Sequence, residues 1–229
     1  MIENPQFMRT FARLPSFREL PATVHQALAR STRRRYLEAG QVIYVEGEAA
    51  EYIYILETGW IKATRMNRDG REQAMMFMQP VDIFGDIAVL TGTTYPGTTT
   101  ALERVGVWFI SADVVWNLIH TYPELAEAII HHLGKRVLNY ISLVEDLSLR
   151  SVEARLAHSL LRHAEVQDGQ LVVPRRKWTT FDEMAIRLGT VRDVLARTLK
   201  TLEAENLLKV EKQVIILLDP KGLTERAGN

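Results

Sequence analysis

Residues 179–200 read TTFDEMAIRLGTVRDVLARTLK, and they carry the signals for two helices separated by a tight turn. Thr180 and Glu183 have the spacing of a capping box, which starts a helix. Gly189 stands where that helix must end in a left-handed residue, and Thr190 is placed to cap a second helix, with Asp193 three residues on. The segment therefore predicts a helix-turn-helix.

The second predicted helix has one apolar face and one charged face. Its inner face is formed by Val194, Leu195, Thr198, Leu199 and Leu202, and the apolar face of the first helix by Met184, Ala185 and Leu188. The charged face carries Arg192, Asp193 and Arg197. Arginine bonds bidentately to guanine in the major groove, and a carboxylate accepts from cytosine, so this face predicts base reading in DNA. The alternative is a solvated charged face, which is common on surface helices.

The segments around this pair favour a winged domain over residues 151–229. Residues 152–164 are amphipathic, and Asp168-Gly169 and Pro174 mark a loop. Residues 207–210 and 214–218 read as strands joined by a polar turn at 211–213. Helices followed by a small hairpin are typical of a winged helix-turn-helix.

The formal net charge of the chain is zero, with 28 basic and 28 acidic residues among 229. This balance is an average, because residues 173–200 hold seven basic and three acidic side chains, a net charge of +4. We predict backbone phosphate contacts, and hence binding that weakens steeply with salt, from Thr180, Thr190, Lys200, Arg175, Arg176 and Lys177.

A long helix is predicted from Pro123 to about Leu149. Its apolar residues alternate three- and four-residue steps at Ile130, Leu133, Val137, Tyr140, Val144 and Leu147. This heptad seam predicts a parallel coiled-coil homodimer through residues 123–150. Burial against the chain's own strands is the alternative.

The N-terminal part changes from helices to strands. Residues 5–35 read as short helices, closed by the basic triplet Arg33-Arg34-Arg35 at a helix C-terminus. Residues 36–110 have glycines at intervals of roughly 8 to 12 residues between apolar runs, which is typical of an all-β sandwich or barrel. A short helix opens at Ser111.

Composition excludes several kinds of chemistry. The chain has no cysteine, which rules out disulfides, cysteine-ligated iron–sulfur clusters and a catalytic thiol. Residues 36–110 contain no histidine, so a cupin-like metal enzyme lacks its ligands there, and we predict that the protein is not an enzyme. No apolar run approaches a membrane span and the start is not a leader peptide, so a cytoplasmic protein without membrane contact is expected.

Several motifs together carry a family resemblance. They are Ala39-Gly40-Gln41-Val42-Ile43, Glu46-Gly47, the run 54–59 (YILETG), Asp69-Gly70-Arg71-Glu72, the run 84–90 (FGDIAVL) and the helix-turn-helix above. With these the chain resembles the CRP/FNR superfamily of bacterial transcription regulators from about Leu14 to Leu218. The resemblance implies an α+β protein: a cyclic-nucleotide-binding-like jelly roll (β-roll) over residues 1–122, a dimerisation helix over 123–150 and a winged helix-turn-helix over 151–229. It also implies double-stranded DNA with an inverted repeat and RNA polymerase as partners, the polymerase meeting the loop 165–169 by analogy.

The resemblance places an effector pocket at Gly85, Asp86, Tyr95, Pro96, Tyr140 and Ile141. Members that bind cyclic AMP have Arg-Ser where this chain has Tyr95-Pro96, and small hydroxyl residues where it has Tyr140 and Ile141. Proline has no N–H and tyrosine cannot neutralise a phosphate. We therefore predict that cyclic AMP does not gate this protein in the usual way.

The sequence leaves the identity of an effector open. The family's haem branch needs an axial ligand, and His120, His131 and His132 lie on or just before the long helix. An unidentified small molecule in the β-roll is the favoured interpretation, and a regulator controlled by its own concentration is the alternative. No cofactor is expected. A protein–protein adaptor that uses the winged domain is a further class of function that the pattern allows.

Overall fold

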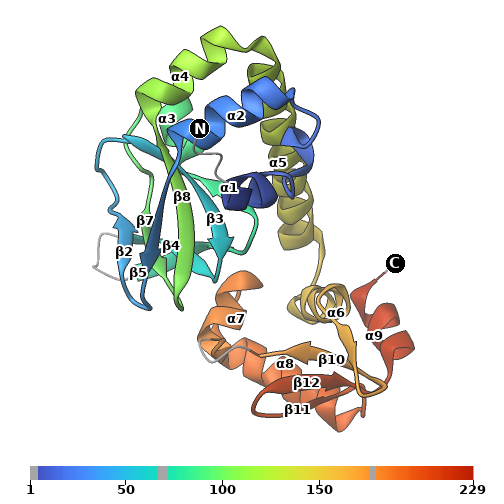
Figure 1. Ribbon diagram of the computed structural model, residues 1–229. Coiled ribbons are helices and arrows are strands. Elements are labelled where there is room, and N and C mark those ends of the chain that lie inside the picture. The colour runs from blue at the N-terminus through green and yellow to red at the C-terminus, as the bar shows by residue number, and fades with distance from the viewer. Residues whose placement is uncertain (1–4, 67–71, 176–178, 229) are drawn as a thin grey trace. The chain divides into compact units, whose positions relative to one another are not determined.

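The computed structural model describes residues 5–66, 72–175 and 179–228 of the chain. The chain forms two compact units, Met1–Val137 and Leu138–Asn229 (Figure 1). The fold is α+β, as predicted, with a β-rich N-terminal unit and a winged helix-turn-helix. The functional boundaries at residues 122 and 150 stay predictions. No described helix has the length and apolar character needed to span a bilayer.

The N-terminal unit contains two four-stranded antiparallel sheets. One has the order β1 (Arg33–Leu37), β8 (Val105–Ser111), β3 (Tyr52–Thr58) and β6 (Asp82–Phe84). The other has the order β2 (Val42–Tyr44), β7 (Thr98–Ala101), β4 (Ile61–Met66) and β5 (Glu72–Met78). The predicted β-roll is confirmed.

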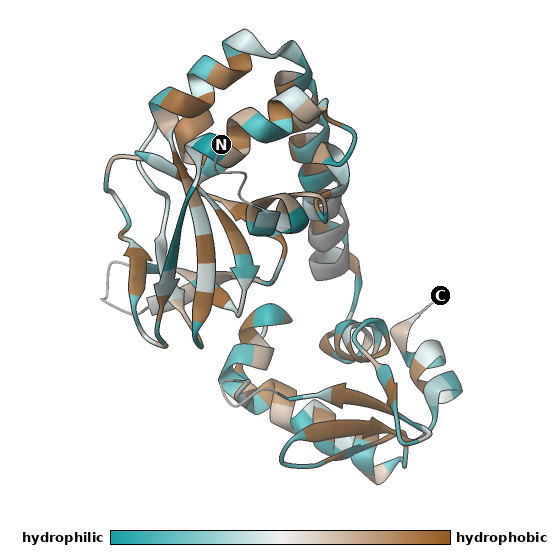
Figure 2. Ribbon diagram, in the orientation of Figure 1, coloured by the Kyte–Doolittle hydropathy of each residue, from teal (hydrophilic) through white to brown (hydrophobic). Residues whose placement is uncertain are grey.

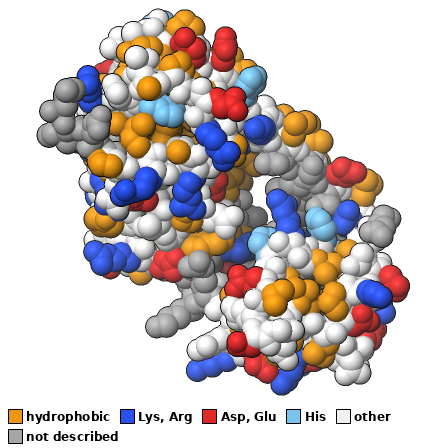
Figure 3. All heavy atoms as spheres, turned by 45° about the vertical axis from the view of Figure 1, so that its right-hand side comes forward, with side chains coloured by type: hydrophobic (Ala, Val, Ile, Leu, Met, Phe, Trp, Pro, Cys, Tyr) orange, Lys and Arg blue, Asp and Glu red, His pale blue; other side chains and the backbone are white. Residues whose placement is uncertain are grey.

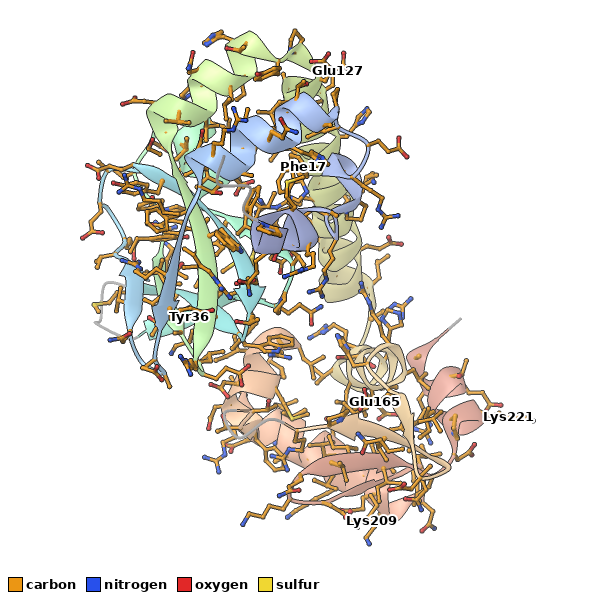
Figure 4. The ribbon with its side chains drawn as sticks, in the orientation of Figure 1. Phe17, Tyr36, Glu127, Glu165, Lys209 and Lys221 are labelled. Atoms are coloured by element: carbon orange, nitrogen blue, oxygen red, sulfur yellow. The ribbon has the colours of Figure 1, made fainter. Side chains whose placement is uncertain are left out.

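Strand β3 is buried on both faces, because successive side chains point to opposite sides of a sheet. Ile53 and Ile55 pack in a core shared with the helices, whereas Tyr54 and Leu56 pack inside the roll. The helices of this unit are α1 (Pro5–Phe11), the 3-10 helix η1 (Pro15–Phe17), α2 (Ala22–Ser31), α3 (Asp86–Thr91) and α4 (Ala112–Thr121). Phe17 of η1 lies against α5 (Pro123–Leu149), with its ring 5.6 Å from that of His132 (Figure 4).

The prediction that Arg33-Arg34-Arg35 closes a helix is wrong. Helix α2 ends at Ser31, and the triplet opens β1, which pairs with β8 from Arg33 opposite Phe109 onward. Arg34 lies 2.6 Å from the buried Glu57 carboxylate and over the Trp108 ring. The strand forms because it pairs with β8, which is distant in sequence. The local sequence pattern does not reveal such a partner.

The C-terminal unit packs helices on one antiparallel sheet of order β11-β12-β10-β9. Its elements are the end of α5, α6 (Val152–Arg162), β9 (Glu165–Gln167), β10 (Gln170–Pro174), α7 (Phe181–Arg187), α8 (Arg192–Ala204), β11 (Leu208–Val210), β12 (Val214–Leu217) and α9 (Pro220–Ala227). Figure 2 shows hydrophobic residues concentrated on β10 and β12. Leu156, Leu195, Leu208, Ile215 and Leu223 are almost fully buried in one core.

Two elements of this unit differ from the predictions. The loop predicted at Asp168-Gly169 is the turn of a β9–β10 hairpin, in which both residues have positive φ, 50° and 78°. Helix α9 is absent from the predicted elements, although Asp219 accepts hydrogen bonds from the backbone of Lys221 and Gly222 and Pro220 opens the helix.

Candidate functional site

The helix-turn-helix is held by its two helix ends. Thr180 Oγ1 accepts from Glu183 N at 3.3 Å and Glu183 Oε2 accepts from Thr180 N at 3.0 Å, which confirms the predicted capping box. Gly189 has φ +62°, the left-handed conformation that glycine adopts without strain. Helix α7 therefore ends where the sequence predicts.

The predicted cap of the second helix is wrong by one residue. Helix α8 begins at Arg192, its N-cap is Val191, and no described side chain caps it. Thr190 belongs to the turn, where its backbone N donates to Ala185 O at 2.9 Å. The turn is longer by that residue because Thr190 closes back on α7.

Arg155 of α6 holds this turn by hydrogen bonds to two of its backbone carbonyls. Its Nε donates to Leu188 O at 2.8 Å, Nη2 donates to Gly189 O at 3.4 Å, and Nη1 donates to Arg150 O at 2.8 Å. Leu188 and Gly189 stand where the end of a helix leaves carbonyls without an internal partner. No local pattern signals this role, because 33 residues separate Arg155 from Leu188.

Helix α8 presents its charged face to solvent. Leu195, Leu199 and Leu202 are buried, whereas Arg192, Asp193, Arg197 and Lys200 are exposed. Arg192 Nη1 lies 3.6 Å from Asp182 Oδ2 of α7, and their side chains are 62% and 60% exposed. An ion pair this exposed is weak, so Asp182 does not hold the Arg192 side chain firmly.

A groove of about 920 Å³ lies beside the start of α8. Among the residues that line it are Thr180, Asp182 and Arg192 of the helix-turn-helix and Lys212 and Gln213 of the turn between β11 and β12. Figure 3 shows basic and acidic side chains interspersed on the faces in view.

The residues predicted to contact phosphates differ in their exposure to solvent. Thr180 and Lys200 are exposed and Thr190 is half-buried. Arg175 is half-buried and bonded within the protein, to Glu211 O and Thr179 O. The predictions at Arg176 and Lys177 lie outside the described residues.

Two residues of the predicted effector pocket, Asp86 and Tyr95, are buried and bonded within the chain. Asp86 at the start of α3 is only 4% exposed, and its Oδ2 lies 2.6 Å from Nη1 of Arg136 on α5. Tyr95 is 3% exposed, stacks on Tyr44 with ring centroids 3.8 Å apart, and donates its hydroxyl to Tyr52 O at 2.8 Å. Asp86 and Tyr95 are thus both engaged by other groups of the protein.

The ring cluster extends beyond this stack. Tyr54 stacks on Phe84 at 5.1 Å, and burial raises the pKa of Tyr44 to about 12 and raises the pKa of Tyr54 as well, so both phenols are neutral. Gly85 has φ +75° and packs closely against Tyr52 and Tyr95. A Cβ at this position would lie 2.9 Å from Tyr52 O and 3.2 Å from the Tyr95 ring, so a larger residue would not fit.

The remaining predicted pocket residues are exposed. Pro96 is exposed. Tyr140 and Ile141 are exposed and belong to the other unit, and within the N-terminal unit the structure brings Gly85, Asp86 and Tyr95 together. The sequence does not single out Arg136, because its partner lies 50 residues away.

Replacing Arg136 with methionine is expected to destabilise the N-terminal unit by about 3–5 kcal/mol, because it leaves the buried Asp86 carboxylate without its cation. Urea unfolding followed by tryptophan fluorescence measures the loss. Lys135→Met, at the exposed neighbouring position, is the matched control. Equal losses in the two variants would contradict this account of the pair.

Two family models match the chain, one over the β-roll and one over the winged helix-turn-helix. The description "Cyclic nucleotide-binding domain" matches residues 34–122, and "Crp-like helix-turn-helix domain" matches residues 154–226. The chain belongs to the CRP/FNR family of transcription regulators. This CRP/FNR protein is therefore a DNA-binding regulator, and its family is not one of enzymes.

Relatives of this CRP/FNR protein carry different names. A CRP-like cAMP-activated global transcriptional regulator of Mycobacterium tuberculosis is 24% identical over 219 residues, covering 94% of this chain and 97% of its own. A global nitrogen regulator of Synechococcus elongatus is 24% identical and covers 99% of both chains. The solved structure of FixK2 from Bradyrhizobium japonicum has a TM-score of 0.72 and 19% identity, covering 86% of this chain and 98% of its own. It shares the fold.

Proposed function

We propose that this CRP/FNR regulator acts as a homodimer on an inverted repeat in bacterial DNA, and so in the cytoplasm, without gating by cyclic AMP. The observation that carries the homodimer is the exposure of the apolar side chains Ile130, Val137 and Val144 in the seam of α5. In the protomer Ile130, Val137 and Val144 are 65%, 55% and 61% exposed, and Tyr140 is exposed as well. Leu133 is half-buried, and the Leu147 side chain lies outside the described part. Apolar side chains that repeat at heptad spacing and stay exposed in the protomer indicate a surface that a second helix buries.

Dimerisation determines how DNA is read. Two-fold symmetry presents two α8 helices in opposite senses, so their half-sites form an inverted repeat one helical turn apart, roughly 34 Å. The exposed side chains of Arg192, Asp193 and Arg197 are the candidates for base contacts. Asp193 also lies in the first turn of α8, where a carboxylate complements the helix dipole.

The interior of the β-roll supports the absence of cyclic AMP gating. Tyr95, which the family resemblance puts at the phosphate position, is stacked on Tyr44, and Asp86, which it puts at the ribose position, pairs with Arg136. A cyclic nucleotide would have to displace stacked, buried rings and find no arginine for its phosphate at Tyr95-Pro96.

Addition of cyclic AMP at about 1 mM is expected to change the affinity of the protein for its DNA less than about twofold, because a ligand without differential binding shifts no equilibrium. Fluorescence anisotropy with the DNA selected by the protein measures this. The cAMP-activated relative of Mycobacterium tuberculosis, on its own site, is the positive control. A tenfold gain in affinity on adding the nucleotide would overturn the proposal.

The β9–β10 hairpin is the surface that we assign to RNA polymerase, by analogy with the family. Val166 of β9 is 73% exposed and lies close to the turn at Asp168 and Gly169. An exposed hydrophobic side chain beside a turn suits a protein contact. Loss of transcription, with DNA affinity retained, in a Val166→Ser variant tests this assignment.

A further inference from the structure

Arg175 connects the wing to the helix-turn-helix. Its backbone N donates to Gln213 O at 2.7 Å, and its Nη1 donates to Glu211 O at 3.1 Å, both in the turn between β11 and β12. Its Nη2 donates to Thr179 O at 3.3 Å, directly before the capping box. One planar guanidinium therefore bonds two segments that are about 30 residues apart in sequence.

The ring of Phe181 completes this site. The guanidinium carbon of Arg175 lies 5.1 Å from the ring centroid, which is within the range of a cation–π contact. Phe181 is the first residue of α7 and is half-buried. The side chain of Arg175 is thus held by two carbonyls and an aromatic face, whereas a phosphate contact needs a cation that is free to face the DNA.

The groove beside the start of α8 lies where this connection acts. Arg175 lines it, together with Arg192 from α8 and Lys212 from the wing turn. The wing turn and the start of α7 both contribute to its lining, so a bond between them fixes its width. Two exposed cations, Arg192 and Lys212, that line one groove suit the negative backbone of a DNA strand.

We propose that Arg175 is a positioning residue for DNA binding: it holds the wing turn against the helix-turn-helix so that Lys212 and Arg192 flank a groove for one DNA backbone strand. The positioning role replaces the predicted role of Arg175 as a phosphate contact. The proposal rests on the proposed function in one respect, that the ligand in the groove is DNA. The wing side chain Lys212 is then a further backbone contact, and its contribution depends on Arg175.

Hydrogen exchange in the free full-length protein tests the positioning without DNA. Arg175→Met and Arg175→Lys should both speed the exchange of the amides around residues 211–214, because lysine cannot bond two carbonyls with a planar fork. Exchange in the buried part of α6, at Leu156 to Leu160 in the core of the same unit, should stay unchanged and shows that this unit is folded in the variants. Wild-type exchange in both variants would overturn the proposal even if the protein binds DNA.

A double-mutant cycle on DNA selected by the wild-type protein tests the coupling. Lys212→Ala should weaken binding roughly fivefold in the wild-type background and lower the salt slope by about one. In the Arg175→Met background the same substitution should have less than about a twofold effect, because the wing is no longer held in place. Equal effects in both backgrounds, or rescue of affinity by Arg175→Lys, would show that Arg175 is a phosphate contact.

Discussion

Replacement of Arg192 by alanine is expected to lower affinity for the selected DNA about 5- to 150-fold, corresponding to about 1–3 kcal/mol, and to relax the preference at one base position. The arginine is exposed at the first residue of α8, where base contacts of a recognition helix lie, and its ion pair with Asp182 is weak. Binding to the selected site and to its variants at each position, measured by anisotropy, gives both quantities.

Lys200→Ala is the matched control for Arg192→Ala. Lys200 is an exposed cation on the same helix, and we assign it to a phosphate. Its loss should weaken binding to all sequences alike. The assignment of Arg192 to a base fails if its variant behaves in the same uniform way.

Introduction of aspartate at Val137 is expected to weaken the homodimer at least about a hundredfold, since an unpaired carboxylate in an apolar seam costs about 3 kcal/mol or more. Val137 is exposed in the protomer, so each chain should still fold. Affinity for the inverted repeat should fall with the dimer, because the second half-site is no longer tethered to the first. Sedimentation velocity at graded concentrations and anisotropy measure the two losses.

Lys135→Asp introduces the same side chain on α5 at an exposed position outside the heptad seam. It should leave dimerisation close to that of the wild type. A Val137→Asp protein that sediments as the wild-type dimer would mean that another surface pairs the chains.

The elements that the sequence predicts well carry their own start and stop signals. Helix α5 begins at Pro123, and α7 is bounded by its capping box and by Gly189. Strand β1 could not be predicted in this way, because Arg33 pairs with Phe109, far along the chain. Strand β9 is three residues long, too short for an alternating pattern to show. Helix α9 did carry a signal, in Asp219 and Pro220.

The candidate site divides in the same way. The exposure of Arg192, Asp193 and Arg197 follows from the helical period, which the sequence displays. The bonds of Arg175 to Glu211 and Thr179, and the pairing of Asp86 with Arg136, depend on how distant segments pack. From net charge and local pattern, Arg175 and Arg136 look like cations available to a ligand. In the fold they bond to other groups of the protein.

The most direct test of the proposed function is selection of bound sequences from random double-stranded DNA by the purified full-length protein, with no ligand added. We expect an inverted repeat whose half-site centres lie about 10 base pairs apart, the spacing of two recognition helices on one face of the duplex. Enrichment of a single unpaired half-site, or of an inverted repeat only when cyclic AMP is added, would contradict a homodimer that reads DNA without gating by cyclic AMP.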